Sequence, residues 1–176
     1  MDVTKTEAAQ QQLTTAIRLY FEDRDPISVH TLAMAASEII DQLCRSNKVP
    51  SMRDEMMADI DPVHHKMVFD ALHKSRNFFK HASPNRPNEV LRDFNDDQNL
   101  YAVLVACEGL RRFGIRPREA TIFTAWVAVI LPVLAHDPPP ADAVAAVFGD
   151  IGSLSRAAQK ECGRDALLLA AAHPGS

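Results

Sequence analysis

The chain has 176 residues, of which 47% are hydrophobic and 24% are charged, enough for one ordinary domain with its own core. This composition argues against disorder of the whole chain. The formal net charge of -4 argues against an unspecific nucleic-acid binder whose entire surface is basic, but it is compatible with a local basic patch.

The cysteines and the apolar segments indicate the cellular compartment. The three cysteines are far apart, odd in number and form no Cys-x-x-Cys pair, so we expect neither a disulfide framework nor a thiolate zinc site. The N-terminal residues contain no apolar run after a basic start, so we expect no signal peptide. The most apolar segment, 121–135, is shorter than the roughly 20 residues that a membrane span requires. These features predict a cytoplasmic protein without a membrane span.

Apolar side chains spaced at helical intervals predict helices from the N-terminus onward. The first helix covers about residues 5–22. The second begins at Asp25-Pro26, where a carboxylate can cap free N–H groups and proline suits the first helical position, and it runs to about residue 45. A break before Pro50 precedes a short methionine-rich helix at 52–60.

A third main helix opens at Asp61-Pro62 and is expected to stop at Ser83-Pro84. Its apolar face includes Val68, Leu72, Ser75 and Phe79, and we expect Phe78 and Phe79 to anchor it in the core.

The second half of the chain predicts two further main helices. Asn95 caps the first of them, and Gly114 supplies the left-handed residue that commonly ends a helix. The other restarts at Arg116-Pro117, with an apolar stripe that includes Trp126 and Val133. Pro132 is expected to kink it, because proline removes a backbone hydrogen bond and crowds the preceding turn.

The last part of the chain is alanine- and leucine-rich, and it follows a proline-rich connector at 136–140. Gly149, Gly152 and Gly163 are expected to divide it into two or three short helices. No segment shows convincing β alternation. The sequence therefore predicts an all-α fold: an antiparallel helical bundle of four to five main helices in 1–136, with a short-helix C-terminal extension, 137–176, packed on the same domain.

The most basic part of this acidic chain lies at the end of the third main helix. Between residues 73 and 92 the ionised side chains are five cations against Glu89 alone, so a polyanion could be held there. The cations are Lys74, Arg76, Lys80, Arg86 and Arg92.

Within this segment, Arg76-Asn77-x-x-Lys80-His81 resembles the motif of HEPN domains, in which an arginine, a polar residue and three further residues precede a histidine. The likeness covers this motif and the helical layout from about residue 13 to 134. It implies a metal-independent, cofactor-free ribonuclease that works as a homodimer, with Arg76 and His81 as the catalytic pair and Asn77 as the polar residue. The basic segment around the motif could add accessory phosphate contacts from Lys80, Lys74 and Arg86. Ribonucleases that resemble this pattern are often restrained by an antitoxin, so an antitoxin-like protein partner is a further expectation.

The chemistry of such a site follows from the residue types. RNA carries its own nucleophile in the 2′-hydroxyl, histidine transfers protons near neutral pH, and arginine offers paired donors to phosphate oxygens. One histidine cannot be acid and base at once, so a two-fold dimer is part of the hypothesis. Five residues correspond to about 140° on a helix, so His81 must lie where the helix ends if it is to approach Arg76.

Alternative roles for the same residues stay open. Some HEPN-like proteins have lost activity, which leaves a non-catalytic binding or dimerisation module for RNA, a nucleotide or a protein partner as the alternative function. Arg76 and Lys80 could form a solvated basic face, and His81 could simply interact with the helix dipole. Glu38 could orient Arg76 or His81 if the second and third main helices are neighbours; otherwise it is exposed or forms a structural ion pair.

A metal site is a third possibility, because histidines and aspartates cluster around the start of the third main helix. Asp61 with His65, and Asp70 with His73, have spacings that place two ligands on one helix face. No complete metal signature is present. The residues concerned are Asp61, His64, His65, Asp70 and His73, with His30 and Glu38 as the other potential ligands.

Overall fold

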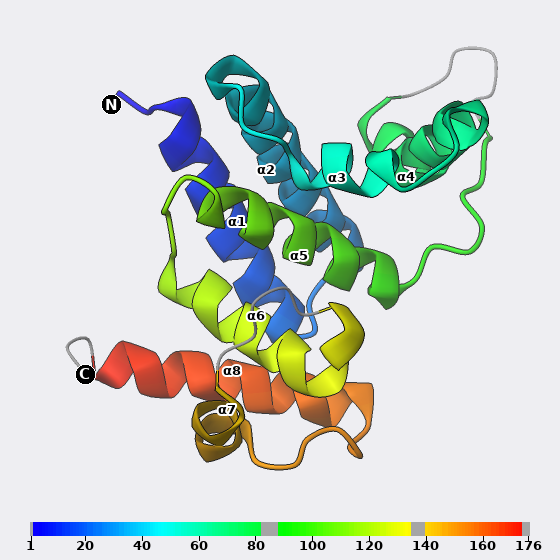
Figure 1. Cartoon of the computed structure of the whole chain (residues 1–176). Coiled ribbons are helices and arrows are strands. Elements are labelled where there is room, and N and C mark those ends of the chain that lie inside the picture. The colour runs from blue at the N-terminus through cyan, green and yellow to red at the C-terminus, as the bar shows by residue number, and fades with distance from the viewer. Residues whose placement is uncertain (1, 82–87, 135–139, 174–176) are drawn as a thin grey trace.

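The computed structural model describes residues 2–81, 88–134 and 140–173, and within these ranges the chain is all-helical, without strands (Figure 1). The prediction of an all-α bundle is therefore confirmed. The elements in chain order are α1 (Lys5–Phe21), α2 (Pro26–Asn47), α3 (Met52–Ala58), the 3-10 turn η1 (Pro62–His64), α4 (His65–Lys80), α5 (Asp96–Arg111), α6 (Arg118–Ile130), the 3-10 turn η2 (Pro132–Leu134), α7 (Ala141–Phe148) and α8 (Arg156–Ala172).

Asp25, Asn95 and Gly114 begin and end helices as predicted, whereas Asp61, predicted to open the third main helix, caps the 3-10 turn η1 that precedes α4. The Asp25 carboxylate accepts from the N–H groups of Ile27 and Ser28 at the start of α2, at 3.3 and 3.0 Å. The side chain of Asn95 accepts from the N–H of Gln98 at the start of α5. Gly114 follows α5 with a φ of 71°, in the left-handed region.

Helices α1 and α2 form the central hairpin, and α5 packs across both of them (Figure 1). Helices α6 and α8 cover the other end of α1, and α7 packs against α6 and α8. The aromatic centre of the core lies here, with ring centroids 5.3 to 5.9 Å apart. Its members are Tyr20, Phe21, Phe123 and Trp126.

The C-terminal extension is part of this core, because α8 contributes directly to it. The indole N–H of Trp126 donates to the carbonyl of Gln159 at 2.7 Å. Gly163 was expected to break a helix, but it lies inside the 17-residue α8. A Cβ at this position would be 2.2 Å from Cε1 of Phe21, so only glycine lets α8 approach α1 this closely.

Pro132 also differs from its prediction, since it follows the end of α6 and does not kink it. The helix ends at Ile130, Leu131 leaves the helical conformation with φ -141° and ψ 69°, and Pro132 opens η2. Val133, predicted to belong to the apolar stripe, is 89% exposed as a result.

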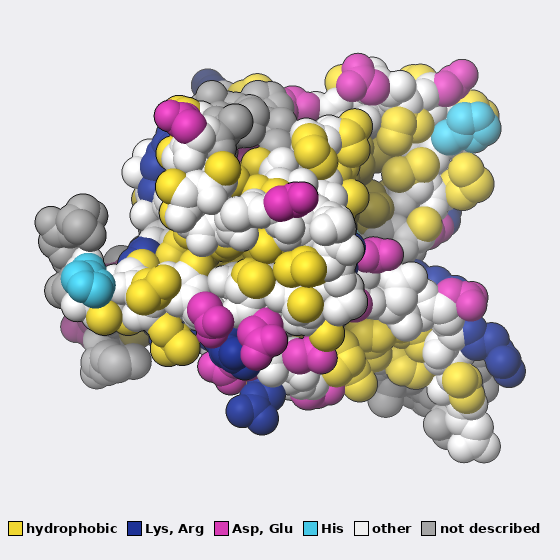
Figure 2. Space-filling model, turned by 90° about the horizontal axis from the view of Figure 1, so that it is seen from below, with side chains coloured by type: hydrophobic (Ala, Val, Ile, Leu, Met, Phe, Trp, Pro, Cys, Tyr) yellow, Lys and Arg dark blue, Asp and Glu magenta, His cyan; other side chains and the backbone are white. Residues whose placement is uncertain are grey.

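Figure 2 views the molecule from the side of α7 and α8, where hydrophobic side chains lie between charged ones. The large apolar side chains exposed on these helices and their connection are Val147, Leu154, Leu168 and Leu169. The C-terminal helices therefore keep apolar surface that the bundle does not cover.

Helix α4 lies on the outside of the bundle, where it packs mainly against α2 (Figure 1). Only His73 and Ser75 are buried within it. Phe78 and Phe79, expected in the core, are half-buried. The ring of Phe79 instead packs edge-on against Phe94, with centroids 5.0 Å apart. The helix that carries the HEPN-like motif is thus among the least buried of the long helices.

Candidate functional site

The predicted site is centred on Arg76, whose side chain leaves α4 toward α2. Its Nη1 donates to the carboxylate of Glu38. Its Nε and Nη2 donate to the side-chain oxygen of Asn77 at 3.1 and 2.8 Å. The guanidinium has five N–H donors, and these contacts use three of them in a fixed orientation.

Lys80 lies one turn after Arg76 on the same face of α4, and its Nζ is 3.4 Å from the second carboxylate oxygen of Glu38. Glu38 comes from the middle of α2, so a single carboxylate meets two cations of the neighbouring helix. The side chain of Arg76 is 19% exposed and that of Glu38 is 37% exposed, so the ion pair is partly shielded from water.

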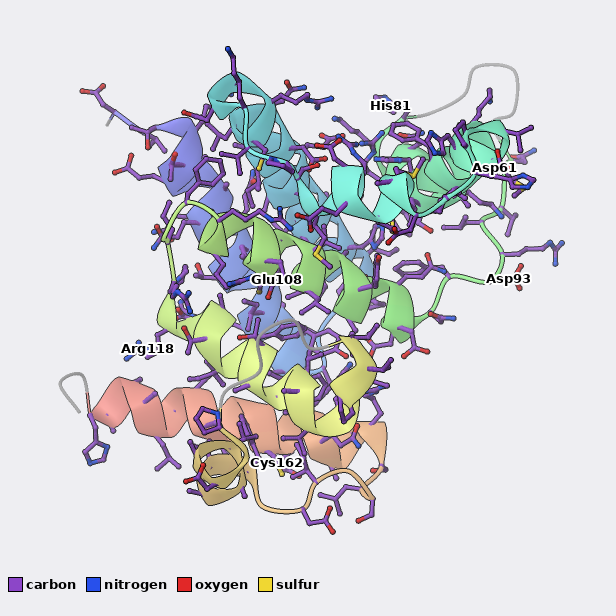
Figure 3. The ribbon with its side chains drawn as sticks, in the orientation of Figure 1. Asp61, His81, Asp93, Glu108, Arg118 and Cys162 are labelled. Atoms are coloured by element: carbon purple, nitrogen blue, oxygen red, sulfur yellow. The ribbon has the colours of Figure 1, made fainter. Side chains whose placement is uncertain are left out.

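His81 is the first residue beyond α4, and its backbone is extended, with φ -130° and ψ 122°. Its N–H still donates to the carbonyl of Asn77 at 3.0 Å, which completes the last turn. Its side chain is exposed at the end of the helix (Figure 3), and it has no hydrogen-bond or ion-pair partner within the described ranges. The structure therefore brings Arg76, Asn77, Lys80 and Glu38 together, but it records no contact between them and the imidazole.

The accessory cations are separate from this cluster. Lys74 is exposed, and Arg86 lies outside the described residues, as do Ser83-Pro84 and residues 136–139 of the connector.

Arg76 lines an open groove of about 740 Å³ between α2, α3 and α4, which we call the α2–α4 groove. Four cations and three carboxylates line it, but His81 does not. Its lining residues are Lys5, Glu38, Ile39, Asp41, Gln42, Leu43, Arg45, Ser46, Arg53, Asp54, Phe69 and Arg76.

Asp41 and Arg53 were not predicted as part of the site, although they form a partly buried ion pair of 2.6 Å in this groove. Burial raises the pKa of Asp41, while Arg53 opposes that shift. The guanidinium of Arg53 also lies over the ring of Phe69, 5.5 Å from its centroid. Nothing in the sequence relates position 41 to position 53, because their contact depends on how the packing of α3 against α5 places Arg53 next to α2.

Most of the side chains considered as metal ligands have other partners. Asp61 accepts from the N–H of Val63 and caps η1. Nε2 of His65 is hydrogen-bonded to the carbonyl of Ile60, and the carboxylate of Asp70 forms an ion pair with Nζ of Lys66 at 2.5 Å.

His73 is likewise engaged, since its Nδ1 is 2.8 Å from the carbonyl of Phe69, and burial lowers its pKa. Among the residues that the structure describes, no three histidine, cysteine or acidic side chains come together closely enough to hold a metal ion. The metal hypothesis therefore has no support within those ranges.

No helix in the described part of the chain is both long and apolar enough to cross a membrane. Comparison of the chain with family models, with curated proteins and with solved structures gives no match, so a function has to be inferred from the site itself.

Proposed function

We propose that this protein is a metal-independent endoribonuclease of HEPN type that acts as a homodimer. The observation that supports the proposal most directly is the fixed guanidinium of Arg76. It is held by Glu38 and Asn77 at the edge of an open groove, one and a half turns before the exposed imidazole of His81.

In this mechanism Arg76 binds the scissile phosphate through the two guanidinium N–H groups that do not donate to Glu38 or Asn77. Arginine matches phosphate oxygens with paired donors, and its charge stabilises the crowded phosphorane. His81 takes the proton from the 2′-hydroxyl, whose oxygen then attacks phosphorus. The bond to the 5′-oxygen breaks, and the products carry a 2′,3′-cyclic phosphate and a 5′-hydroxyl.

The leaving 5′-oxygen needs a proton donor while His81 acts as the base. A second copy of the chain, related by a two-fold axis, supplies another imidazole for this role. We therefore expect the active species to be a dimer, and specific activity should fall when the protein is diluted below its dimer dissociation constant.

The decisive experiment incubates the purified chain with single-stranded RNA in EDTA. We expect cleavage to 2′,3′-cyclic ends, and we expect Arg76→Ala and His81→Ala to lower the rate by at least about 100-fold, the usual contribution of a general acid–base group or an electrostatic donor. His64→Ala and Arg164→Ala are matched controls, because they remove an exposed histidine or arginine elsewhere and should leave cleavage unchanged. Circular dichroism checks that each variant folds.

A second candidate function is a HEPN-like module that binds RNA, a nucleotide or a protein partner without turnover. The observation that favours it is the ion pair itself, since Glu38 already neutralises Arg76 and Lys80 approaches the same carboxylate. RNA binding without cleavage in the same assay supports this function. Cleavage that EDTA abolishes contradicts both proposals.

A further inference from the structure

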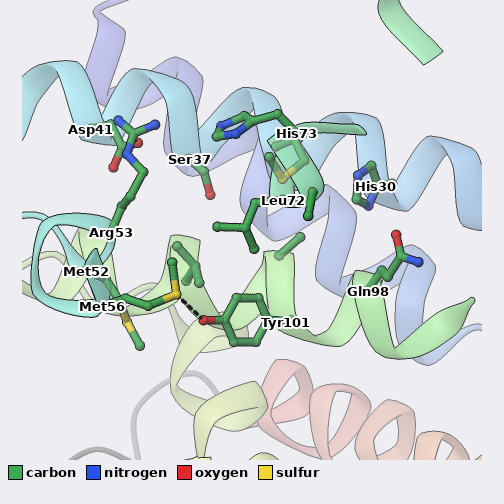
Figure 4. A pocket seen from close by; sticks show the side chains of 14 residues that line it. His30, Ser37, Asp41, Met52, Arg53, Met56, Leu72, His73, Gln98 and Tyr101 are labelled. Atoms are coloured by element: carbon green, nitrogen blue, oxygen red, sulfur yellow. Dashed lines mark hydrogen bonds and ion pairs between the residues drawn. The ribbon is translucent and has the colours of Figure 1, made fainter. Parts of the chain in front are cut away.

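The three carboxylates that line the α2–α4 groove are all paired within the protein. Glu38 forms an ion pair with Arg76. Asp41 forms one with Arg53, whose side chain extends from α3 to α2 (Figure 4). Asp54 accepts from the N–H and the hydroxyl of the residue that caps α3, at 3.0 and 2.8 Å. The groove therefore offers no free negative charge to a ligand from the residues that the structure describes.

Two of the four cations that line the same groove are unpaired. Lys5 lies at the start of α1, and Arg45 lies in the last turn of α2. Both side chains are exposed, and neither has a hydrogen-bond or ion-pair partner within the described ranges. Because the unpaired charge of the groove is positive, an anionic ligand is favoured over a cationic one.

The position of Arg45 on α2 sets the length of such a ligand. Arg45 follows Glu38 by seven residues, close to two full helical turns, so both project from the same side of α2. At a rise of 1.5 Å per residue, they are about 10 Å apart along the helix axis. Glu38 holds Arg76, so the groove has a cation at each end of this interval. A stacked nucleic-acid strand carries a phosphate about every 3.4 Å of its axis, so about three phosphates cover the distance.

Phe69 adds an aromatic side chain to the α4 wall of the groove. It is 41% exposed, although its ring packs against His73 with centroids 4.0 Å apart. The guanidinium of Arg53 lies 5.5 Å from the centroid of the same ring. A base that enters here meets the exposed part of the ring or the plane of the guanidinium, and both of these groups stack on bases. Unpaired cations beside an exposed aromatic ring are the usual features of a site for single-stranded nucleic acid.

We propose that the α2–α4 groove holds the single-stranded RNA that extends beyond the scissile phosphate, with its phosphates on Arg45 and Lys5 and a base against Phe69. The inference rests on the proposed function, since the strand enters the groove from Arg76. Duplex RNA is a poor ligand for this site, because its bases are already stacked on one another and do not reach the ring. Contacts to phosphates carry no base information, so Arg45 and Lys5 confer affinity without sequence preference.

The test measures RNA binding separately from cleavage. The His81→Ala chain is titrated against a labelled oligouridylate of about eight nucleotides, within the usual site size of single-strand binders, and followed by fluorescence anisotropy. Adding Arg45→Ala or Lys5→Ala should weaken binding by about fivefold each at 0.1 M salt. The reason is that each phosphate contact to a single strand contributes about 0.7 to the slope of log affinity against log salt, and this slope should fall accordingly.

Two controls separate the groove from unspecific attraction. Arg116→Ala removes an exposed arginine that does not line the groove and has no partner in the described part of the chain, so affinity and salt slope should stay unchanged. A uridine dinucleotide reaches Arg76 but is too short to reach Arg45, so Arg45→Ala should leave its affinity, measured by competition, unchanged. Phe69→Leu keeps an apolar side chain but removes the stacking surface, and should weaken binding of the longer strand by about fivefold or more.

The outcomes distinguish this proposal from the proposed function. Cleavage by the unaltered chain, with RNA affinity unaffected by Arg45→Ala and Lys5→Ala, overturns the groove proposal and leaves the ribonuclease in place. Absence of cleavage, with binding that depends on both cations, supports the groove in a module that binds RNA without turnover. Tighter binding of polyglutamate than of RNA, lost in Arg45→Ala, would mean that the groove takes an acidic protein partner, and overturns the proposal.

Discussion

The ion pair between Glu38 and Arg76 gives the most direct test of the proposed site, because it joins α4 to α2. A double-mutant cycle with Glu38→Ala, Arg76→Ala and the double variant measures their coupling free energy. Exposed ion pairs contribute about 0.2–1 kcal/mol, whereas hydrogen bonds to charged groups contribute about 1.5–3 kcal/mol. Since the two side chains are 37% and 19% exposed, we expect a coupling of about 1–2 kcal/mol.

The pair between Lys66 and Asp70 is a matched control on the same helix. Its atoms are 2.5 Å apart, but its side chains are 87% and 60% exposed. Pairs of this kind, four residues apart on a helix, couple by about 0.3–0.5 kcal/mol. Urea unfolding, followed by circular dichroism, measures the free energies of unfolding from which both coupling free energies are calculated. If the coupling of Glu38 with Arg76 is no larger than that of the control, the carboxylate does not hold the guanidinium in place.

The isosteric change Glu38→Gln tests whether Glu38 orients Arg76 for catalysis or acts only through its negative charge. It removes one negative charge next to Arg76 and Lys80, so affinity for RNA should rise or stay the same. If Glu38 orients Arg76 for catalysis, the cleavage rate at saturating RNA should nevertheless fall by about tenfold or more, the effect of losing an orienting contact. A rate that rises in parallel with affinity contradicts a positioning role.

Two further predictions concern stability. Burial lowers the pKa of His30 and of His73, so the unfolded chain binds more protons below about pH 6.5. The free energy of unfolding should therefore fall from pH 7 to pH 5, by less than about 1.4 kcal/mol per pH unit for each histidine, and replacing either by Gln should flatten the pH profile measured by urea unfolding. Gly163→Ala should destabilise by about 1–3 kcal/mol through its clash with Phe21, while Gly152→Ala, whose nearest neighbouring atom would be 3.8 Å away, should leave the melting temperature nearly unchanged.

Local signals in the sequence located the helices well, because each depends on neighbouring residues only. Asp25 and Asn95 cap the N–H groups that directly follow them. Gly114 adopts the left-handed conformation that ends the helical segment after α5. The capping boxes of Thr4 and Ser51, each with an acidic residue three positions later, are equally local signals, and both helix starts could have been predicted from them.

Features that depend on distant packing could not be predicted in this way. Gly163 resembles a helix breaker until the ring of Phe21, 142 residues earlier in the chain, occupies the space where a Cβ would lie. Likewise, the spacing of Arg76 and Lys80 predicts that they share a face of α4. Only the packing of α4 on α2 makes Glu38 their common partner.

The helix that carries the proposed site is also held less firmly than the core. Few residues of α4 are buried, and segments with few buried contacts open at a lower free-energy cost than the core does. In the proposed mechanism, the approach of His81 to Arg76 therefore depends on what fixes α4 from outside its own sequence: the Glu38 pair on one side and the proposed second protomer on the other. Each of these can be removed separately. A variant that loses the ion pair but keeps cleavage would assign the positioning of α4 to the dimer.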